Sequence, residues 1–238
     1  MYGFGYTGII ASMKKVGAAP PSYPASLTLF IDAGNAASYP GTGTTVTDLI
    51  GTQNGTLTNG VGYSSADGGY FTFDGVNDYI DFGINNAIRT TSARTISLWI
   101  NINSGYGNFF SDINVAGYQG AELWFDTSYF RTVVCGAATY QIAPLYNNFS
   151  YSTWHYVTLS WNGTTLKSYW DGVLNTSVSQ TVIPVNNTTA STKLGLSNEL
   201  GGRIPLNGKI SQCKIYNVQL SDAEVLTDFN EFKARYGY

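Results

Sequence analysis

Carboxylates are the side chains of this 238-residue chain that are best suited to hydrolytic chemistry. Hydrolysis of a glycosidic bond needs two of them on opposite sides of the bond, about 5 to 9.5 Å apart. Glu122 and Asp126 share one side of an expected strand, and Leu123 lies on the other side. Four residues of strand rise separate the two carboxylates by roughly 13 Å. This distance is too large for a catalytic pair without a third group.

A second acidic group, formed by Asp74, Asp78 and Asp81, surrounds an expected turn. Asp side chains in turns commonly bond nearby backbone amides, and we expect that role here, with a metal or ligand role as the alternative. His155 is the only histidine, which excludes a metal site with several histidines. No Gly-x-Ser-x-Gly elbow accompanies it. The sequence therefore predicts no catalytic residue and a protein that is not an enzyme.

Aromatic side chains are the remaining candidates, and their chemistry would be the binding of sugars. Trp99 and Trp154 fall on the face of their expected strands opposite to the apolar series. An exposed indole stacks on a sugar ring or anchors an interface, with loop Asn and Asp residues supplying orientation. We therefore predict Trp99 and Trp154 as ligand-binding residues. The alternative is that loops or a C-terminal helix cover both rings.

The elements that position these residues are expected to be β-strands, because short runs with strand-like patterns alternate with Gly, Asn and Asp. The apolar alternation over 95–102 predicts a half-buried strand. An Asn-Gly pair between 155–161 and 166–173 predicts a hairpin. A short connection between 70–73 and 79–82 predicts a second hairpin. Runs at intervals of about ten residues are typical of an all-β sandwich.

One helix is expected, over residues 221–233. Ser221 and Glu224 have the spacing of a capping box, which satisfies two backbone donors at a helix start. Leu220 and Val225 are placed to form a hydrophobic staple around that cap. Four apolar residues at helical spacing predict one face packed on the sandwich. They are Val225, Leu226, Phe229 and Phe232.

Charge and cysteine content limit the partners of the chain. The formal net charge is -3 and only 11% of the residues are charged, so no basic stripe is available for nucleic acid. No run of about 18 apolar residues occurs, and we expect no membrane insertion. Cys135 and Cys213 have no Cys or His at ligand spacing. We expect two buried core cysteines, with one disulfide as the alternative.

The N-terminal 26 residues differ in composition from the rest. They are rich in Gly, Tyr, Ala and Pro, show no sustained period and lack the basic start of a secretory signal. Such an apolar segment gains stability by ordering against another subunit. The sequence predicts an attachment arm over 1–26 and a single domain over 27–238. The expected partners of the arm are further copies of the chain or other proteins of a particle.

Four separated stretches resemble the laminin G-like or concanavalin A-like jelly-roll domains. They are FDGVNDYI at 73–80; TISLW at 95–99; WHYVTLSW at 154–161 with YWDG at 169–172; and NGKI at 207–210 with KIYN at 214–217 and LSDAE at 220–224. The resemblance covers about 200 residues and implies an all-β fold, a two-sheet antiparallel jelly-roll sandwich, to which the sequence adds one short C-terminal helix.

The resemblance also implies a structural calcium in many members, held by a carboxylate of the final long strand and oxygens of the first. Where those members have an Asp after Gly-x-Ile, this chain has Ser211 and then Gln212. The charge that a hard cation requires is missing there. Asp32 in the first strand can still contribute one ligand. We expect no cofactor, with calcium at Asp32 as the alternative.

The resemblance does not imply one function, because the same sandwich serves lectins, hydrolases and virus particle proteins. Versions with a Gly- and Pro-rich arm look like those encoded by tailed bacteriophages. The first hypothesis is therefore a non-enzymatic virion structural protein, a capsid decoration or fibre or tail subunit, that displays a lectin-like jelly roll for adhesion to host-surface glycans. The alternative is an extracellular or cell-surface carbohydrate-binding module of a bacterium. A third is a carbohydrate-active enzyme with unrecognised acids.

Overall fold

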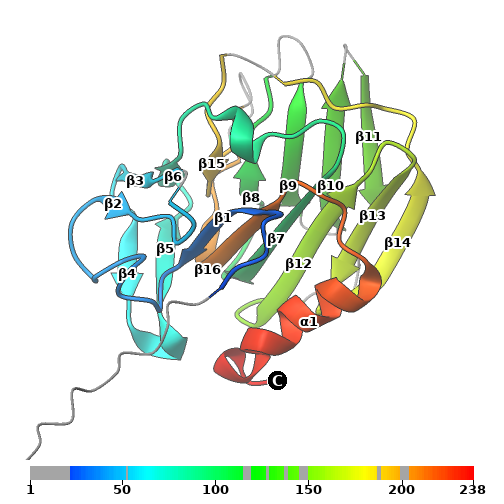
Figure 1. Ribbon diagram of the computed structural model, residues 1–238. Coiled ribbons are helices and arrows are strands. Elements are labelled where there is room, and N and C mark those ends of the chain that lie inside the picture. Colours follow the sequence, from blue (N-terminus) through cyan, green and yellow to red (C-terminus); the bar gives the residue numbers. More distant parts are fainter. Residues whose placement is uncertain are drawn as a thin grey trace, which may run out of the picture.

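Two antiparallel sheets and one C-terminal helix make up the fold of this computed structural model (Figure 1). The structure describes residues 22–51, 53–114, 119–126, 129–136, 139–144, 150–186, 189–198 and 204–238. The prediction of an all-β, two-sheet sandwich with one short C-terminal helix is confirmed. Within the described residues, no helix is long and apolar enough to cross a membrane.

The first sheet runs in the order β14-β13-β12-β7-β16-β5-β4, with β1 paired to β16. Its strands are β14 (Val173–Ser179), β13 (Thr165–Trp170), β12 (Trp154–Trp161), β7 (Arg94–Ile102), β16 (Asn207–Tyr216), β5 (Tyr70–Asp74), β4 (Gly62–Ser64) and β1 (Leu27–Asp32). One edge of the long strand β16 pairs with β7, and its other edge is shared by β5 and β1. This sharing brings the N-terminal strand beside the last strand of the sheet.

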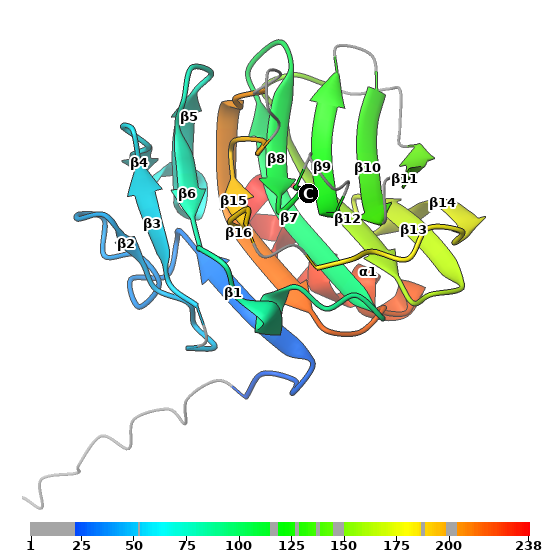
Figure 2. The ribbon, with the colours of Figure 1, turned by 90° about the horizontal axis from the view of Figure 1, so that it is seen from above.

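The second sheet runs in the order β11-β10-β9-β8-β15-β6-β3-β2. Its strands are β11 (Thr139–Pro144), β10 (Tyr129–Gly136), β9 (Gly120–Asp126), β8 (Gly107–Ser111), β15 (Lys193–Leu194), β6 (Tyr79–Asp81), β3 (Gly55–Thr58) and β2 (Thr45–Val46). Short 3-10 helices cover Ala66–Gly68, Asn86–Ile88 and Lys233–Tyr236, and the α-helix α1 covers Asp222–Phe232. Figure 2 shows β9 to β11 on one side of the sandwich and α1 on the other.

Strand β7 is buried on both faces, so the prediction of a half-buried strand is wrong. Its apolar residues enter the core between the sheets as expected, for example Leu98 and Ile100. Its opposite face, which carries Ser97 and Trp99, is buried as well. The reason is that the C-terminal segment packs over this face, which alternation within one strand does not reveal.

One of the two expected hairpins forms. β12 and β13 pair antiparallel, and the Asn162 side chain accepts hydrogen bonds from the amides of Thr164 and Thr165 at 3.0 and 2.9 Å. Gly163 takes a φ of +87°, which a glycine adopts without strain. The Asn-Gly signal therefore predicted the turn correctly.

The second expected hairpin is wrong, because β5 lies in the first sheet and β6 in the second. Phe73 and Ile80 both enter the core, from opposite sheets rather than from neighbouring strands. A short connection between two strands with one apolar face each fits either arrangement. The turn chemistry is as expected, since Asp78 accepts from the Asp74 amide and Asp74 accepts from the Val76 amide, at 3.1 and 2.8 Å.

Helix α1 begins as predicted. The Ser221 hydroxyl accepts from the Glu224 amide, and the Glu224 carboxylate accepts from the Ser221 amide, at 3.3 and 2.7 Å. Val225 and Phe229 are buried against the first sheet. Leu226 is 43% exposed, so its expected place on the packing face is wrong. The packing face of the helix is thus narrower than its sequence indicates.

Both cysteines are free and buried, as expected for core residues. Burial raises the pKa of Cys213 to about 12, so its thiol stays protonated at neutral pH. The predicted arm lies outside the described residues over 1–21. Its last residues are described, and Tyr23 packs edge-on against Phe30 with ring centroids 5.7 Å apart. The existence of an attachment arm remains a prediction.

We predict that Ser221→Ala lowers the free energy of unfolding by about 1 kcal/mol, because one donor at the start of α1 loses its partner. For a domain of this size the melting temperature falls by about 2 to 4 °C. The matched control is Leu226→Ala, which changes an exposed side chain of the same helix and leaves the melting temperature within about 2 °C. Thermal unfolding followed by circular dichroism measures both, and equal effects would contradict the role of the cap.

Candidate ligand-binding site

The two tryptophans predicted to bind a ligand lie inside the structure. Trp99 is 0% exposed, and its ring stacks on Tyr236 and Phe229 with centroid distances of 4.1 and 5.5 Å. Trp154 is 6% exposed, and its Nε1 donates to Asp67 at 3.1 Å. The expectation of exposed indoles is wrong, and the alternative, cover by the C-terminal segment, describes the structure. Neither ring presents a face for a sugar.

Asp32, the residue considered as a calcium ligand, is held by the protein itself. Arg235 donates to both of its carboxylate oxygens at 2.7 and 3.2 Å. Gln212 Nε2 and the Gly34 amide each donate a further hydrogen bond to the Asp32 carboxylate at 2.8 Å, so the carboxylate accepts four in all. Among the described residues no three His, Cys, Asp or Glu side chains gather to hold a metal. The residues at Asp32 therefore suit a guanidinium rather than a calcium ion.

His155 has the surroundings of a structural residue. Its Nδ1 lies 3.0 Å from an oxygen of Asp171 and 3.2 Å from the hydroxyl of Tyr238. Its ring lies against Trp170 with a centroid distance of 4.5 Å. These contacts tie the start of β12 to the end of β13 and to Tyr238, so His155 packs and bonds within the fold.

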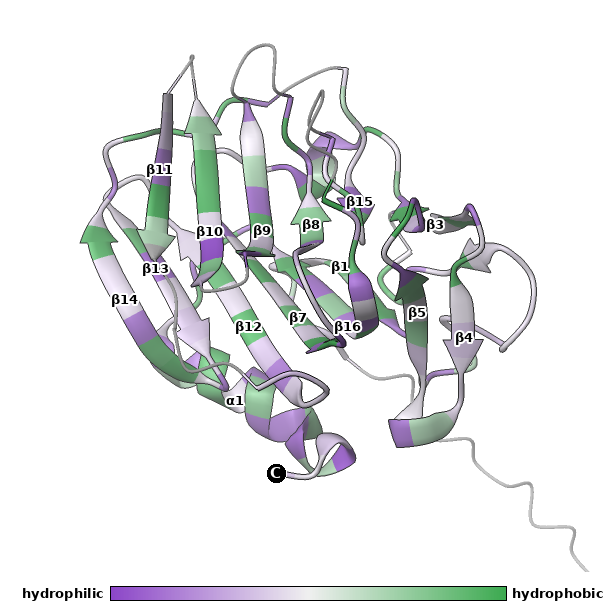
Figure 3. Cartoon of the chain, turned by 180° about the vertical axis from the view of Figure 1, so that it is seen from behind, coloured by the Kyte–Doolittle hydropathy of each residue, from purple (hydrophilic) through white to green (hydrophobic). Residues whose placement is uncertain are grey.

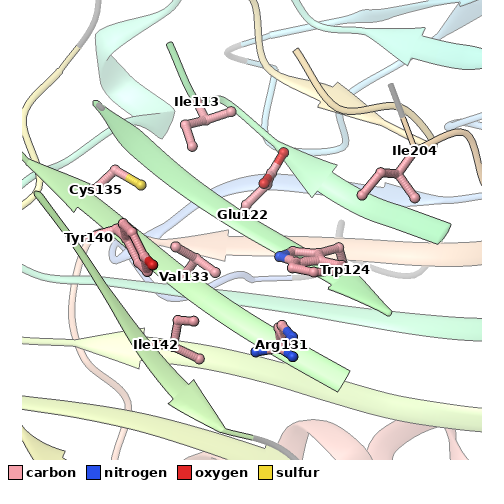
Figure 4. A pocket seen from close by; sticks show the side chains of 9 residues that line it. All are labelled: Ile113, Glu122, Trp124, Arg131, Val133, Cys135, Tyr140, Ile142 and Ile204. Carbon is pink, nitrogen blue, oxygen red and sulfur yellow. The ribbon is translucent and has the colours of Figure 1, made fainter. Parts of the chain in front are cut away.

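A hollow of about 390 Å³ lies on the outer face of the second sheet, the face turned away from the first sheet (Figure 4). Strand register builds it, because β9, β10 and β11 are neighbours. Glu122 lies opposite Val133, and Val133 lies opposite Ile142. Two residues along, Trp124 lies opposite Arg131. Opposed residues of an antiparallel pair share a face, so these five side chains point outward together.

The same strands alternate between this hollow and the core. Leu123, Phe125, Phe130 and Val134 enter the core between the sheets. Figure 3 shows the corresponding alternation of hydropathy along β9. The outer face carries its own small apolar cluster, separate from the main core. Its buried members are Ile113, Val133 and Cys135, with Trp124 and Ile142 packed against them.

The rim of the hollow combines aromatic rings with charge. The Arg131 guanidinium lies over the Trp124 ring, 5.3 Å from its centroid. Arg131 Nε donates to Asp126 Oδ2 at 2.8 Å, which fixes the guanidinium in that position. Tyr140, from β11, is 58% exposed. Two aromatic side chains and one guanidinium are thus available at the surface of one cavity.

A buried carboxylate lies at the base of the hollow. Glu122 is 6% exposed and accepts a hydrogen bond from the Ser197 hydroxyl. A carboxylate has about four acceptor sites, so it can accept from ligand hydroxyls as well. The second carboxylate of this strand, Asp126, is engaged by Arg131 and by the Tyr129 amide. This arrangement suits the binding of a polar ligand.

Trp124 is the residue that the sequence reasoning missed. Glu122 and Asp126 were expected on the side of β9 opposite Leu123, and the same spacing puts Trp124 between them on that outward side. The tryptophans first considered, Trp99 and Trp154, belong to the other sheet. The alternation along β9 places Trp124 on the outward side, but the sequence does not show which strands lie beside it.

We predict that Arg235→Met destabilises the protein by about 3 kcal/mol, because Asp32 is 3% exposed and loses its charged partner. The double variant Asp32→Asn with Arg235→Met should recover part of this loss, since no charge is left buried alone. A chelator should leave the melting temperature of the wild-type protein unchanged. A calcium-dependent melting temperature, or no recovery in the double variant, would contradict the assignment of Arg235 as the partner of Asp32.

Comparison with known proteins agrees with this fold. The binding domain of botulinum neurotoxin DC, solved in complex with rat synaptotagmin II, superposes with a TM-score of 0.68 and 16% identity over 87% of this chain and 52% of that one. A structure of botulinum neurotoxin type C, described with the dependence of its cell entry on interaction with two ganglioside molecules, superposes with a TM-score of 0.68 and 15% identity over 87% of this chain and 51% of that one. The binding domain of botulinum neurotoxin serotype D superposes with a TM-score of 0.67 and 17% identity over 87% of this chain and 52% of that one.

This chain thus spans about half the length of those binding domains, and the likeness is one of fold. A search with the sequence among curated proteins finds no match. A family model described as the concanavalin A-like lectin/glucanases superfamily, Laminin_G_3, matches residues 73–226. This match covers more than half of the chain and includes β7, β12, β13 and all the residues that line the hollow. The chain belongs to the concanavalin A-like lectin/glucanases superfamily.

Proposed function

We propose that the chain is a non-enzymatic, lectin-like binding domain and that the hollow on the outer face of the second sheet binds a glycan. One observation carries the proposal. The indole of Trp124 lies at the surface between the guanidinium of Arg131 and the buried carboxylate of Glu122. The three groups come from two paired strands, which hold them in fixed positions.

A sugar ring is the ligand whose chemistry matches these groups. Its C–H face packs on an aromatic ring, for which Trp124 and Tyr140 are available. Its hydroxyls donate to a carboxylate such as Glu122 and accept from a guanidinium such as Arg131. A volume of about 390 Å³ lies within the range of small-molecule sites. The hollow accommodates one or two sugar units.

The charge of the site favours a neutral sugar. Glu122 and Asp126 contribute two negative charges and Arg131 one positive charge, and Asp126 already bonds Arg131. An anionic sugar would have to approach the buried carboxylate of Glu122, which costs electrostatic energy in a site of reduced dielectric. We therefore expect neutral hexoses to bind more tightly than sialylated glycans.

The setting that we propose is a virus particle, with the chain as a capsid decoration or a fibre or tail subunit. The apolar composition of 1–26 supports this, because such a segment gains stability by ordering against a partner. The partners would be other virion proteins or further copies of the chain. The alternative setting is a secreted or cell-surface bacterial protein that uses the same site as a carbohydrate-binding module.

We predict that Trp124→Ala weakens binding to the best glycan by at least about tenfold, because the stacking face is lost. A glycan array of the labelled protein identifies that glycan, and calorimetry gives the dissociation constants. The melting temperature should change little, since Trp124 packs on the outer face rather than in the core. The matched control is Tyr106→Ala, which removes an aromatic ring that is 55% exposed and does not line this hollow.

Two results would overturn the glycan site. One is a glycan array without signal at high multivalency. The other is equal loss of affinity in Trp124→Ala and Tyr106→Ala, which would place the site elsewhere.

We predict that a chain beginning at Ser22 keeps the melting temperature within about 3 °C but no longer assembles. It retains Tyr23, which packs on Phe30, and it lacks the apolar part of the arm. Light scattering compares its mass with that of the full chain. Assembly that is unchanged by the truncation would remove the support for a virion setting, and glycan binding by the shortened chain would still test the hollow separately.

A further inference from the structure

Four Asn-Gly pairs occur in the chain, and they differ in how the fold holds them. They are Asn54-Gly55, Asn59-Gly60, Asn162-Gly163 and Asn207-Gly208. In such a pair the backbone nitrogen of the glycine can attack the side-chain carbonyl carbon of the asparagine, because glycine has no side chain to hinder the approach. Ring closure requires the nitrogen and the carboxamide to turn towards each other. Hydrogen bonds at either group therefore slow the reaction.

The pair at Asn162 is exposed but held at both reacting groups. Asn162 Oδ1 accepts hydrogen bonds from the amides of Thr164 and Thr165. The Gly163 amide, which carries the attacking nitrogen, donates to Gln180 Oε1 at 2.7 Å. Ring closure would break all of these bonds. The hairpin turn thus protects its own asparagine.

The pairs at Asn54 and Asn207 run into strands. Gly55 is the first residue of β3 and Gly208 is the second residue of β16, and both are buried. Asn54 Oδ1 accepts from the Asp48 amide at 3.0 Å. The Asn207 carboxamide bonds two neighbouring polar side chains, each at 3.1 Å. Turning either glycine nitrogen towards its asparagine would disrupt the pairing of a strand.

The pair at Asn59 is held least. Asn59 and Gly60 lie between β3 and β4, and both are exposed. In the part of the chain that the structure describes, the Gly60 amide makes no hydrogen bond. The Asn59 side chain makes one, from Nδ2 to the Asn77 carbonyl at 2.9 Å. The carbonyl carbon of the side chain and the nitrogen that attacks it are therefore both available.

We propose that Asn59 is a site of spontaneous modification, at which the chain converts this asparagine to aspartate and isoaspartate. The Gly60 nitrogen forms a bond to Asn59 Cγ, the Cγ–Nδ2 bond breaks, and ammonia leaves with the proton of the Gly60 amide. Water then opens the succinimide ring. Its addition at Cγ gives aspartate, and its addition at the main-chain carbonyl carbon leaves the backbone running through Cγ, which is isoaspartate. The site is independent of the glycan hollow.

The Asn59 side chain joins two connections that cross between the sheets at one end of the sandwich (Figure 1). The turn after β3 leads from the second sheet to the first, and the turn after β5 leads from the first to the second. The hydrogen bond from Asn59 to Asn77 ties these turns together. A carboxylate has no donor and repels a carbonyl oxygen, so the modification breaks the tie. The broken fraction grows with the age of the protein and needs no enzyme.

Peptide mapping of the full chain after incubation at mildly alkaline pH tests the proposal, with fragmentation in the mass spectrometer to locate each conversion. Asn59 should convert at least about tenfold faster than the other three asparagines, because their reaction must first break more hydrogen bonds. Two products of equal mass should separate by chromatography, and each should gain one heavy oxygen in labelled water. No conversion at Asn59, or an equal rate at Asn162, would overturn the proposal.

The same incubation in concentrated urea is the control for the role of the fold. In the unfolded chain the four pairs should convert at similar rates, because each asparagine precedes a glycine and no hydrogen bond holds it. If Asn59 were still the one fast site, its neighbours in the sequence would select it rather than the structure, and the inference would be wrong.

Asn59→Asp reproduces one product and measures its effect on the fold. The melting temperature should fall by about 1 to 3 °C, since a repulsion replaces one hydrogen bond. The matched control is Asn162→Asp, which keeps an oxygen acceptor for the amides of Thr164 and Thr165 and should leave the melting temperature within about 1 °C. Equal shifts in the two variants would contradict the tie between Asn59 and Asn77.

Discussion

The packing of the C-terminal segment over the outer face of the first sheet is the interaction on which the other features depend. Trp99 at the centre of that sheet stacks on Tyr236 and Phe229. Polar contacts hold the same segment at several points, since Arg235 bonds Asp32 and the Tyr236 hydroxyl bonds Ser211. Because this cover buries β7 and β12 completely, the first sheet has aromatic side chains on both faces without exposing them. A strand that is buried on both faces needs such a cover.

The cover also decides which face of the sandwich can bind a ligand. In the described part of the chain no helix covers the outer face of the second sheet over β9 to β11, and the apolar cluster on that face is small. Trp124 therefore stays accessible beside Arg131, while the indoles of Trp99 and Trp154 serve folding. Both sheets use the same alternation of inward and outward residues, so the difference between them comes from what covers the outward side. Fold membership alone does not identify this face, because members of the superfamily differ in function.

The sequence predicted correctly those elements that depend on residues close to each other in the chain. The capping box at Ser221 and the Asn-Gly turn at Gly163 depend on residues within four positions of each other. What the sequence did not reveal depends on residues far apart. The partner of Asp32 is Arg235, 203 positions away, and β6 joins the other sheet from β5 although only a short turn separates them. In the candidate site, the sequence pattern of β9 places Trp124 on the outward side. The position of Arg131 beside it depends on the register between β9 and β10, which the sequence does not reveal.

The two ends of the first sheet differ in how completely the protein bonds its buried charged side chains. Asp32 and Arg235 form a balanced pair, and Lys214 is balanced by Asp228 and Glu231 at 2.9 and 2.8 Å. Both of these groups tie the C-terminal segment to the first sheet, so the protein itself supplies each counter-charge. At the opposite end of β7, Arg94 has donors that Asp112 does not fill. A buried donor without an acceptor costs free energy. In the part of the chain that the structure describes, Nε and Nη2 of Arg94 are two such donors, and they lie among strands β7 and β8, which are buried along their whole length.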